Sequence, residues 1–329
     1  MTEYDAVLLV SFGGPETPDE VMPFLENVTR GRGVPRERLL GVAEHYHHFG
    51  GRSPINDQNR ALKAALEREL ETHGPKLPVY WGNRNWHPLL AATIGQMKQD
   101  GIRRAVAFVT SAFSSYSGCR QYQENIARAC AEVGEGAPEI DKLRVFSDHP
   151  AFLEVIRQEA FDALHELPPE RRHEAYFLFT AHSIPTAMAD TCRYAEQLQQ
   201  ASAAVARLLR RDRYRLVYQS RSGAPTQPWL EPDVLDAIRE LHQQGVRSLV
   251  IVPIGFVSDH IEILYDLDTE ARALCEEAGI VMARAATTGT HPYFVRMIRE
   301  LIVERMEGGG VIPGLCTPDC CPALRPVRG

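Results

Sequence analysis

The sequence predicts an α/β fold of two similar, doubly wound domains with parallel sheets. Three observations support this prediction: short apolar runs, longer amphipathic segments between them, and a weak internal repeat. Nearly continuous apolar runs are typical of strands that are buried on both faces, as they are in a parallel sheet. Strand patterns that alternate with helical patterns indicate an α/β architecture.

The expected elements follow one another in a regular order. Apolar runs, many of them rich in β-branched residues, predict strands at residues 6–12, 77–82, 105–112, 176–181, 214–219 and 249–256. Amphipathic segments predict helices at residues 56–73, 88–99, 121–132, 151–167, 195–210 and 231–242. The strands are therefore separated by segments long enough for crossover helices.

A unit of helix, turn and strand recurs along the chain. Gly101 leads into the strand at 105–112, and Gly245 leads into the strand at 249–256. Glycine is the usual residue just past a helix end. We interpret the recurrence as two like-folded domains, 1–146 and 147–307, with a tail at 308–329, although any two such units share some likeness. Because ligands of open α/β sheets bind at the carboxyl ends of the strands, we expect a cleft between the domains.

Composition excludes several classes of protein. The chain has 329 residues, 44% hydrophobic and 24% charged, which is usual for a globular protein and excludes a disordered or fibrous one. Its net charge of −7 argues against a broad nucleic-acid-binding face. The acidic start does not resemble a signal peptide, and no apolar run approaches the roughly 20 residues of a transmembrane helix. We therefore expect a monomeric, soluble, cytoplasmic protein with reduced thiols.

A histidine stands where α/β enzymes often place reactive groups. His182 follows the apolar run 176–181 and opens a turn before Pro185. Loops at the carboxyl ends of strands commonly carry catalytic side chains. A histidine can accept a proton or bind a metal ion near neutral pH. The alternative is a histidine whose ring bonds a backbone carbonyl and has no chemical role.

Three carboxylates follow the strand at 249–256 in a largely apolar segment. Glu262, Asp266 and Glu270 are four residues apart, so a helix over 259–270 places them on one face. Like charges at this spacing destabilise a helix slightly, and a solvated acidic face is one interpretation. The other is a row of hard oxygen ligands along which a divalent cation passes. Carboxylates with a neutral imidazole, such as that of His182, also suit ferrous iron.

Two loop segments suit contact with a ligand. Residues 29–38, together with 51–54, are basic in an acidic chain, and arginine side chains suit carboxylate or phosphate groups. A solvated loop is the alternative. Gly13 and Gly14 follow the first strand, but the third glycine of a dinucleotide-binding fingerprint is absent and Pro15 intervenes. We interpret this turn as a tight loop close to a ligand.

Several segments, taken in order, resemble the ferrochelatase family. They are GGRSP at 50–54, TAHSIP at 180–185, QSRSG at 219–223, PWLEPD at 228–233 and GFVSDHIE at 255–262. The likeness runs from about residue 5 to residue 301, and the chain most resembles the actinobacterial branch, which uses coproporphyrin III. It implies two doubly wound domains around a porphyrin cleft. It also implies a lyase of heme biosynthesis, which inserts Fe²⁺ into coproporphyrin III to form Fe-coproporphyrin III (coproheme) with loss of two pyrrole protons.

The same resemblance suggests roles for individual residues. His182 and Glu262 are implied as the catalytic pair at the metal, with Asp266 and Glu270 as outer carboxylates along which metal approaches. Ser53 and Tyr122 match porphyrin-binding positions. A porphyrin is a flat apolar disc with acidic side chains at its rim, so it needs apolar walls and polar anchors. Further expected porphyrin contacts are Phe12, Thr29, His45, Tyr46, Arg52 and Trp229.

Phe12 departs from the family pattern. Many relatives have a tyrosine at this place, facing the metal. A phenylalanine has no oxygen, so the axial metal ligand that a tyrosine would offer on this side of the porphyrin is absent.

Four of the seven cysteines have an expected role by the same resemblance. Many relatives hold a [2Fe–2S] cluster with one internal and three C-terminal cysteines, and such a cluster requires four ligands. The matching residues here are Cys119, Cys316, Cys320 and Cys321, so we expect the tail to fold back onto Cys119. Their spacing differs from the animal pattern, and a zinc site, free thiols or a disulfide are alternatives. The other cysteines, expected to be buried or incidental, are Cys130, Cys192 and Cys275.

Other functions remain as alternatives to a coproporphyrin III ferrochelatase. They are a protoporphyrin IX ferrochelatase, a related cobalt or nickel chelatase, and a tetrapyrrole carrier without turnover. A periplasmic-type binding protein is disfavoured by the absence of a signal peptide. The expected partners are coproporphyrin III, Fe²⁺ and, transiently, neighbouring enzymes of the heme pathway.

Overall fold

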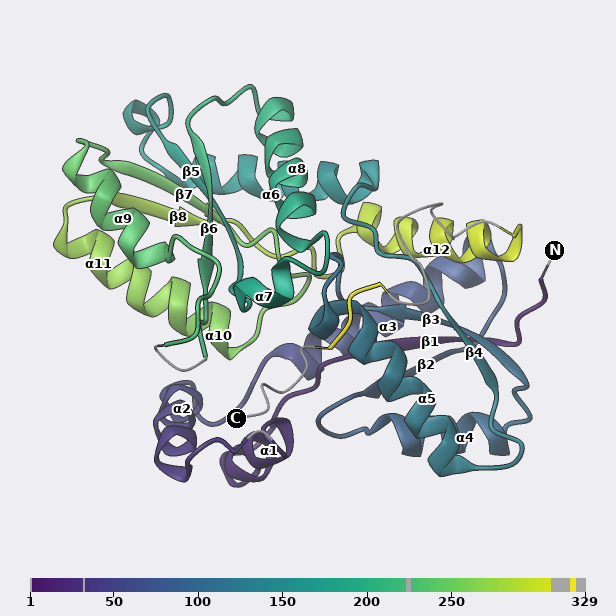
Figure 1. Cartoon of the computed structure of the whole chain (residues 1–329). Coiled ribbons are helices and arrows are strands. Elements are labelled where there is room, and N and C mark those ends of the chain that lie inside the picture. Colours follow the sequence, from purple (N-terminus) through teal and green to yellow (C-terminus); the bar gives the residue numbers. More distant parts are fainter. Residues whose placement is uncertain (1, 32, 223–225, 309–319, 324–329) are drawn as a thin grey trace.

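Two parallel four-stranded sheets form two lobes that stand side by side (Figure 1). The computed structural model describes residues 2–31, 33–222, 226–308 and 320–323. The strand order is β2-β1-β3-β4 in the first lobe and β6-β5-β7-β8 in the second, and all neighbouring strands are parallel. The predicted fold class, α/β with two similar parallel sheets, is confirmed.

The strands agree with the predicted apolar runs at the centre of each sheet. The first sheet contains β1 (Ala6–Ser11), β2 (Val79–Asn83), β3 (Arg104–Val109) and β4 (Glu139–Lys142). The second contains β5 (Tyr176–His182), β6 (Tyr214–Gln219), β7 (Ser248–Val252) and β8 (Val281–Arg284). The edge strands β4 and β8 were not predicted, because they are short and largely unburied on one side and so lack a continuous apolar run. The predicted strand at 249–256 ends at Val252, since Pro253 has no N–H to continue the ladder.

Equivalent strands occupy equivalent places in the two sheets. The recurring unit in the sequence matches β3 with β7, each the third strand in its sheet order. Alternate residues of β1 pack on opposite faces of the first sheet: Val7 and Leu9 belong to one apolar cluster, and Leu8 and Val10 to another. Both faces of the strand are therefore covered, which explains the continuous apolar run in the sequence.

Helices cover the sheets and connect the strands. In chain order they are α1 (Val21–Val28), α2 (Arg36–His48), α3 (Ile55–His73), α4 (Leu90–Gln99), α5 (Gln121–Val133), α6 (Pro150–Glu166), α7 (Thr186–Ala189), α8 (Tyr194–Leu208), α9 (Val234–Gln243), α10 (Ile261–Ile263), α11 (Arg272–Glu277) and α12 (Pro292–Met306). Short 3₁₀ turns are η1 (Pro18–Glu20) and η3 (Pro169–Arg171), and π-helical segments are η2 (Tyr116–Arg120) and η4 (Leu264–Ala271). None of the helices in the described part of the chain is long and apolar enough to cross a membrane.

The last helix crosses back to the first lobe. α12 packs against α3 and α6, and Figure 1 shows it lying along the first lobe beside the N-terminus. The Arg299 guanidinium contacts Glu69 of α3 at 2.9 Å, and the Thr2 N–H donates to the Met306 carbonyl at 2.7 Å. The division of the chain at residues 146 and 307 stays a prediction, and this helix ties its C-terminal part to the first sheet.

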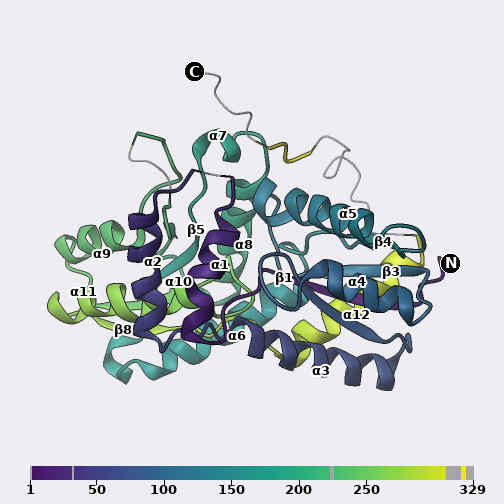
Figure 2. The ribbon, with the colours of Figure 1, turned by 90° about the horizontal axis from the view of Figure 1, so that it is seen from below.

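The first lobe also reaches across to the second. α1 and α2 follow β1 and pack on each other, and α2 lies beside α10 in both views (Figures 1 and 2). The Asp259 N–H, just before α10, donates to Gln58 of α3 at 2.9 Å. The loops after the strands of both sheets are thus brought together, which is where the candidate residues lie.

Candidate active site

His182 and Glu262 lie close together at the end of β5. His182 is the last residue of that strand, and Glu262 is in α10. The Nε2 atom of His182 is 3.8 Å from Oε2 of Glu262. The Nδ1 atom of His182 is bonded to the carbonyl of Ser183, and because a carbonyl only accepts, Nδ1 carries the proton of the neutral ring. Nε2 therefore keeps its lone pair and can accept a proton or bind a metal.

A second imidazole, His260, joins this pair. Its Nδ1 atom lies 3.9 Å from the same Oε2 atom of Glu262, and its ring packs edge-on against Phe256. Burial lowers the pKa of His260, so the ring is neutral at pH 7. His260 was not predicted as a site residue, because a helical pattern puts residues two apart, such as His260 and Glu262, on different faces. The backbone at His260 is extended, which brings it to the same side as Glu262; its place in the segment at 255–262 was the available signal.

The outer carboxylates follow on the π-helix η4, which continues α10. Burial raises the pKa of Asp266 to about 7, and Asp266 accepts hydrogen bonds from Gln219 at 3.2 Å and from the Ser220 hydroxyl. Glu270 is exposed at the far end of the segment. Among the described His, Cys, Asp and Glu side chains, no three are placed so that they could hold a metal ion. The metal-binding roles of these carboxylates stay predictions.

Arg284 holds the acidic segment 259–270 by two ion pairs. Arg284, at the end of β8, contacts Asp268 of η4 at 2.8 Å and Asp259 at 3.2 Å. The side chain of Arg284 is only 14% exposed, and its partners are 21–25% exposed. The two ion pairs of Arg284 hold the loop before His260 and the helix after it in one arrangement.

Aromatic rings from the first lobe form a wall, which we call the aromatic wall and define as Phe12, Phe24, Tyr46 and Trp86. The centroid of Phe24 lies 6.3 Å from that of Phe12 and 5.9 Å from those of Tyr46 and Trp86. Phe12 follows β1 and is 36% exposed, whereas Phe24 is buried. An exposed phenylalanine on a buried aromatic base is suited to contact with a flat apolar ligand.

Arg84 joins the aromatic wall to Tyr122 and was not predicted. Its guanidinium lies 5.6 Å from the centroid of Phe12 and 4.7 Å from that of Tyr122, and it donates to the Ser117 carbonyl at 3.0 Å. Tyr122 is buried, which raises the pKa of its hydroxyl. Arg84 comes directly after β2, so its place at a strand end was the signal.

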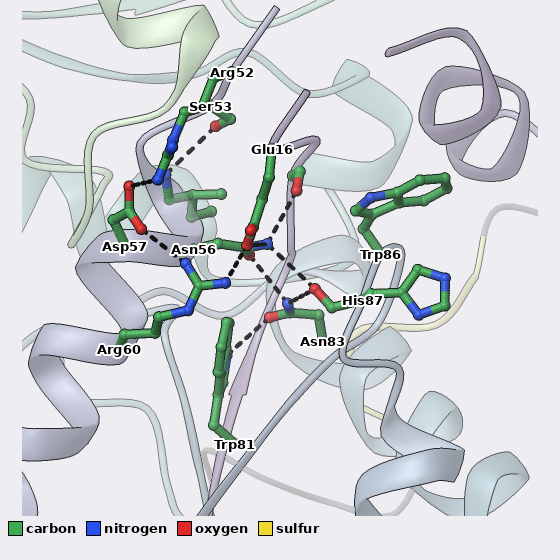
Figure 3. Close-up of polar contacts among 12 residues, drawn as sticks. Glu16, Arg52, Ser53, Asn56, Asp57, Arg60, Trp81, Asn83, Trp86 and His87 are labelled. Carbon is green, nitrogen blue, oxygen red and sulfur yellow. Dashed lines mark hydrogen bonds and ion pairs between the residues drawn. The ribbon is translucent and has the colours of Figure 1, made fainter. Parts of the chain in front are cut away.

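Buried amides hold the loops of this region together (Figure 3). Asn56 and Asn83 are almost completely buried, and the Nδ2 atom of Asn83 donates to Oδ1 of Asn56 at 3.1 Å. The Nδ2 atom of Asn56 in turn donates to the Gly14 carbonyl, to Glu16 and to the His87 carbonyl. One amide pair thus joins the loop after β1, the loop after β2 and the start of α3.

The predicted contact Ser53 lies at the edge of this network. Its side chain is 3% exposed, and a Cβ atom on Gly14 would lie 2.8 Å from the Ser53 Cβ, so glycine is required for this close approach. The neighbouring Arg52 points away and pairs with Asp57, and both side chains are about half exposed. Ser53 is therefore held rigidly, whereas Arg52 is available at the surface.

The remaining predicted contacts lie in three different surroundings. His45 of α2 stacks on Tyr265 of η4 with centroids 3.6 Å apart, which closes the lobes on that side. The hydroxyl of Thr29, the residue just after α1, donates to the Leu25 carbonyl at 2.7 Å. Trp229 is half-buried beside Pro185, and its indole N–H has no partner in the described structure.

The described cysteines of the tail lie against the segment that carries Cys119. Arg120, next to Cys119, donates to the Cys320 carbonyl at 3.2 Å, and Figures 1 and 2 show residues 320–323 running between α7 and the start of α5. Burial, and then the thiols of Cys119, Cys320 and Cys192, raise the pKa of Cys321 to about 12. The predicted return of the tail to Cys119 is confirmed for these residues, and Cys316 lies outside the described part of the chain.

The cysteines form no metal-binding group within the described residues. All of the described cysteines are free thiols. Cys192 was expected to be incidental, but it is close enough to Cys321 to affect the pKa of that thiol. Cys275 is buried and Cys130 partly buried, as expected.

Comparisons with known proteins agree with the family that the sequence motifs resemble. The family model described as Ferrochelatase matches residues 4–306. A protein of Rhodopirellula baltica named ferrochelatase is 55% identical, over 99% of this chain and 96% of the relative. Proteins named coproporphyrin III ferrochelatase are 50% identical in Mycolicibacterium vanbaalenii and 51% identical in Streptomyces coelicolor, over 96% and 98% of this chain and 98% and 94% of the relatives.

Solved structures share the fold. The sirohydrochlorin chelatase SirB of Bacillus subtilis subspecies spizizenii in complex with cobalt matches with a TM-score of 0.55 at 9% identity, over 93% of this chain and 97% of that one. CbiX, the terminal enzyme for biosynthesis of siroheme in denitrifying bacteria, matches with a TM-score of 0.52 at 16% identity, over 91% of this chain and 98% of that one. At these identities the likeness concerns the fold alone, which is that of the chelatases, as predicted.

Proposed function

Because the chain belongs to the ferrochelatase family, we propose that it inserts Fe²⁺ into coproporphyrin III and releases Fe-coproporphyrin III. The family makes it an enzyme of the lyase class in heme biosynthesis. The choice of coproporphyrin III rests on relatives of that name that are about half identical over nearly the whole chain. The observation that carries the chemistry is the pair of His182 and Glu262, with Nε2 and Oε2 3.8 Å apart at a strand end.

The reaction needs a base for each of two pyrrole protons, since two N–H bonds break as the Fe–N bonds form. We assign one proton to Nε2 of His182, which has a lone pair because Nδ1–H is held by the Ser183 carbonyl. The neutral ring of His260 suits the second. The carboxylate of Glu262 lies within 4 Å of both imidazoles, so it stabilises the imidazolium that each transfer forms. It is also a hard oxygen ligand for the incoming Fe²⁺.

The porphyrin is proposed to lie between the lobes, with one face on the aromatic wall. Phe12 supplies exposed apolar surface, while Tyr46, Tyr122 and Trp229 line the surroundings. Polar groups at the rim suit the four acid side chains of coproporphyrin III, and the proposed rim contacts are Thr29, His45, Arg52, Ser53 and Arg84. Their binding energy would favour a distorted ring that presents its nitrogen lone pairs.

The approach of the metal is assigned to Asp266 and Glu270. Glu270 is exposed and Asp266 half-buried on the same π-helix, so the two carboxylates lead from solvent towards Glu262. Oxygen ligands without a closed binding group hold a divalent cation weakly, and weak binding suits passage rather than storage.

A [2Fe–2S] cluster at Cys119, Cys316, Cys320 and Cys321 is the finer part of this proposal. It is supported by the position of Cys320 and Cys321 beside the Cys119 segment. It is opposed by the arrangement of the described thiols, which do not form a metal-binding group. When bound, such a cluster can exchange one electron, and its four thiolates would tie the tail to the first lobe.

The cellular setting is proposed on the same basis. A cytoplasmic monomer fits an enzyme whose substrates are Fe²⁺ and a four-acid porphyrin, which is more soluble than a two-acid one. Transient contact with neighbouring enzymes of the pathway would limit release of the reactive product.

A paired assay tests the proposed function. Purified protein is mixed anaerobically with Fe²⁺ and either coproporphyrin III or protoporphyrin IX, and the loss of the free-base absorbance bands is followed over many turnovers. We expect steady turnover with coproporphyrin III and slower turnover with protoporphyrin IX. A single stoichiometric binding step without turnover would instead indicate a carrier, and activity only with Co²⁺ and sirohydrochlorin would indicate a cobalt chelatase.

A further inference from the structure

We propose that Tyr194 is a positioning residue for His182, and that the first turn of α8 is the strut that fixes this histidine relative to the first lobe. The inference rests on the proposed function, because His182 is the base whose position matters. It concerns two residues, Tyr194 and Gln197, that have no place in the catalytic constellation itself. Both lie in the first turn of α8 and are three residues apart, so they project from the same side of the helix.

Tyr194 holds the main chain of the histidine. Its hydroxyl donates to the His182 carbonyl at 2.9 Å, at the point where β5 ends. The tyrosine is 7% exposed, and its ring packs edge-on against Phe113 of the first lobe with centroids 6.2 Å apart. Because the buried Tyr194 hydroxyl donates to the His182 carbonyl, it restrains the main chain from which the imidazole projects.

Gln197 ties the same helical turn to the first lobe. Its Oε1 atom accepts the Ser114 N–H at 2.7 Å, and its Nε2 atom donates to the Ser114 hydroxyl at 3.1 Å. Both residues are buried. Ser114 lies in the loop after β3. This strand is a neighbour of β1 in the first sheet, and Phe12 comes directly after β1. The strut thus runs from the first-lobe loops through α8 to the His182 carbonyl.

This arrangement explains how a histidine of the second lobe keeps its place against a substrate held by the first. The imidazole is fixed at its ring by the Ser183 carbonyl and at its backbone by Tyr194. Removing the Tyr194 hydroxyl leaves the substrate surfaces intact but releases the carbonyl of this peptide, whose N–H still donates to the Gln219 carbonyl at 2.8 Å. Since a displacement of about 1 Å of a reacting group can lower a rate by about 100-fold, the loss falls on turnover rather than on porphyrin binding.

Tyr194→Phe tests the proposal, with Tyr176→Phe as the matched control. Tyr176 begins β5, the strand that His182 ends, and its hydroxyl likewise donates to a main-chain carbonyl, that of Tyr214, at 3.3 Å. We expect Tyr194→Phe to lower kcat for iron insertion about 5- to 20-fold. KM for coproporphyrin III, and its Kd by fluorescence quenching, should stay within about twofold of wild type. Tyr176→Phe should leave all three unchanged.

Different outcomes separate this inference from the proposed function. A wild-type protein that inserts no iron would contradict the proposed function itself. An active wild type with a fully active Tyr194→Phe variant would overturn only the positioning role. A fall in kcat accompanied by equal losses of porphyrin affinity and thermal stability would indicate a structural role, and would overturn it as well.

The strut has a second test in a double-mutant cycle. Gln197→Leu removes the link to Ser114 while keeping the buried volume similar. We expect it to lower kcat on its own and to cost less in a Tyr194→Phe background, since both changes release the same turn. Strictly multiplicative effects on kcat would contradict a single strut.

Discussion

Nε2 of His182 and Oε2 of Glu262 lie 3.8 Å apart, and Nδ1 of His260 lies 3.9 Å from the same oxygen. One carboxylate is therefore placed between two imidazoles. The side chains of His182 and Glu262 are 33% and 49% exposed, so both remain accessible to a substrate. This arrangement offers two proton acceptors and one charge that stabilises their protonated forms, which is what removal of two pyrrole protons requires.

Asp266 gives a prediction about stability and pH. Burial raises the pKa of Asp266 to about 7, whereas an aspartate in an unfolded chain titrates near about 4. Between these values the folded state holds a proton that the unfolded state has released. The contribution of Asp266 to the free energy of unfolding therefore falls as pH rises from about 4 to about 7, and stays low above that.

Asp266→Asn should remove this loss, because asparagine resembles the protonated carboxyl. We expect its free energy of unfolding to exceed that of wild type at pH 8, by at most about 4 kcal/mol, and the difference to shrink at pH 5. Urea titrations at the two pH values measure it. A difference that is the same at both pH values would contradict the assigned cause.

Arg284 is expected to be essential to the acidic segment. Replacing it with methionine leaves Asp259 and Asp268 without their partner, and removal of one member of a buried ion pair typically costs about 3–5 kcal/mol. Since the partners keep some exposure, we expect about 2–4 kcal/mol from urea unfolding, with a loss of iron insertion as the His260 loop moves. Arg239→Met, which removes an exposed pair with Asp236, is the control and should change little. Equal stability of the two variants would refute the role of Arg284.

Asn56 should support both folding and porphyrin binding. Asn56→Ala removes the Oδ1 acceptor of the Asn83 amide and leaves the Gly14 carbonyl without its donor, while Glu16 and the His87 carbonyl keep Arg60 and Asn83 as donors. Each buried group that loses its partner costs about 1–3 kcal/mol. We expect a loss of about 2–4 kcal/mol in unfolding free energy and a raised KM for coproporphyrin III, because Ser53 and the aromatic wall lose their support. Thr72→Ala, at the exposed end of the same helix, should do neither. An unchanged KM in Asn56→Ala would show that the Asn56–Asn83 network does not support the substrate site.

The cysteines give a spectroscopic prediction. Anaerobically purified protein should show the visible absorption bands of a [2Fe–2S] centre, and these bands should be lost in Cys320→Ser but kept in Cys130→Ser. Metal analysis should find about two atoms of iron for each chain. Colourless protein that contains zinc, or bands that survive in Cys320→Ser, would exclude the proposed ligand set.

Sequence patterns predicted the parts of the fold that burial controls. The central strands β1, β3, β5 and β7 are largely apolar because helices cover both faces of the sheets, and the sequence pattern reflects that burial. The edge strands β4 and β8 escaped prediction because their exposed sides carry polar residues. The order of strands is a property of long-range pairing, which local periodicity does not contain.

The candidate site was predictable where its residues end strands or repeat along a helix. His182 ends β5, and Glu262 is the first of the carboxylate series. His260 and Arg84 were missed, since their proximity depends on an extended residue before α10 and on rings brought together from separate loops. Hydrogen-bond partners of buried polar groups, such as Asn56 and Asn83, arise only from the tertiary packing of loops.

The rate of iron insertion in His182→Ala and Glu262→Ala decides whether this pair of side chains carries the chemistry. Each variant is mixed anaerobically with Fe²⁺ and coproporphyrin III, and formation of the iron porphyrin is followed by absorbance at saturating porphyrin, with His165→Ala as an exposed control. We predict losses in kcat of about 100-fold or more for both variants, as expected for a missing base or for its missing charge partner, with porphyrin still bound. Wild-type rates in both variants would show that His182 and Glu262 do not carry the chemistry.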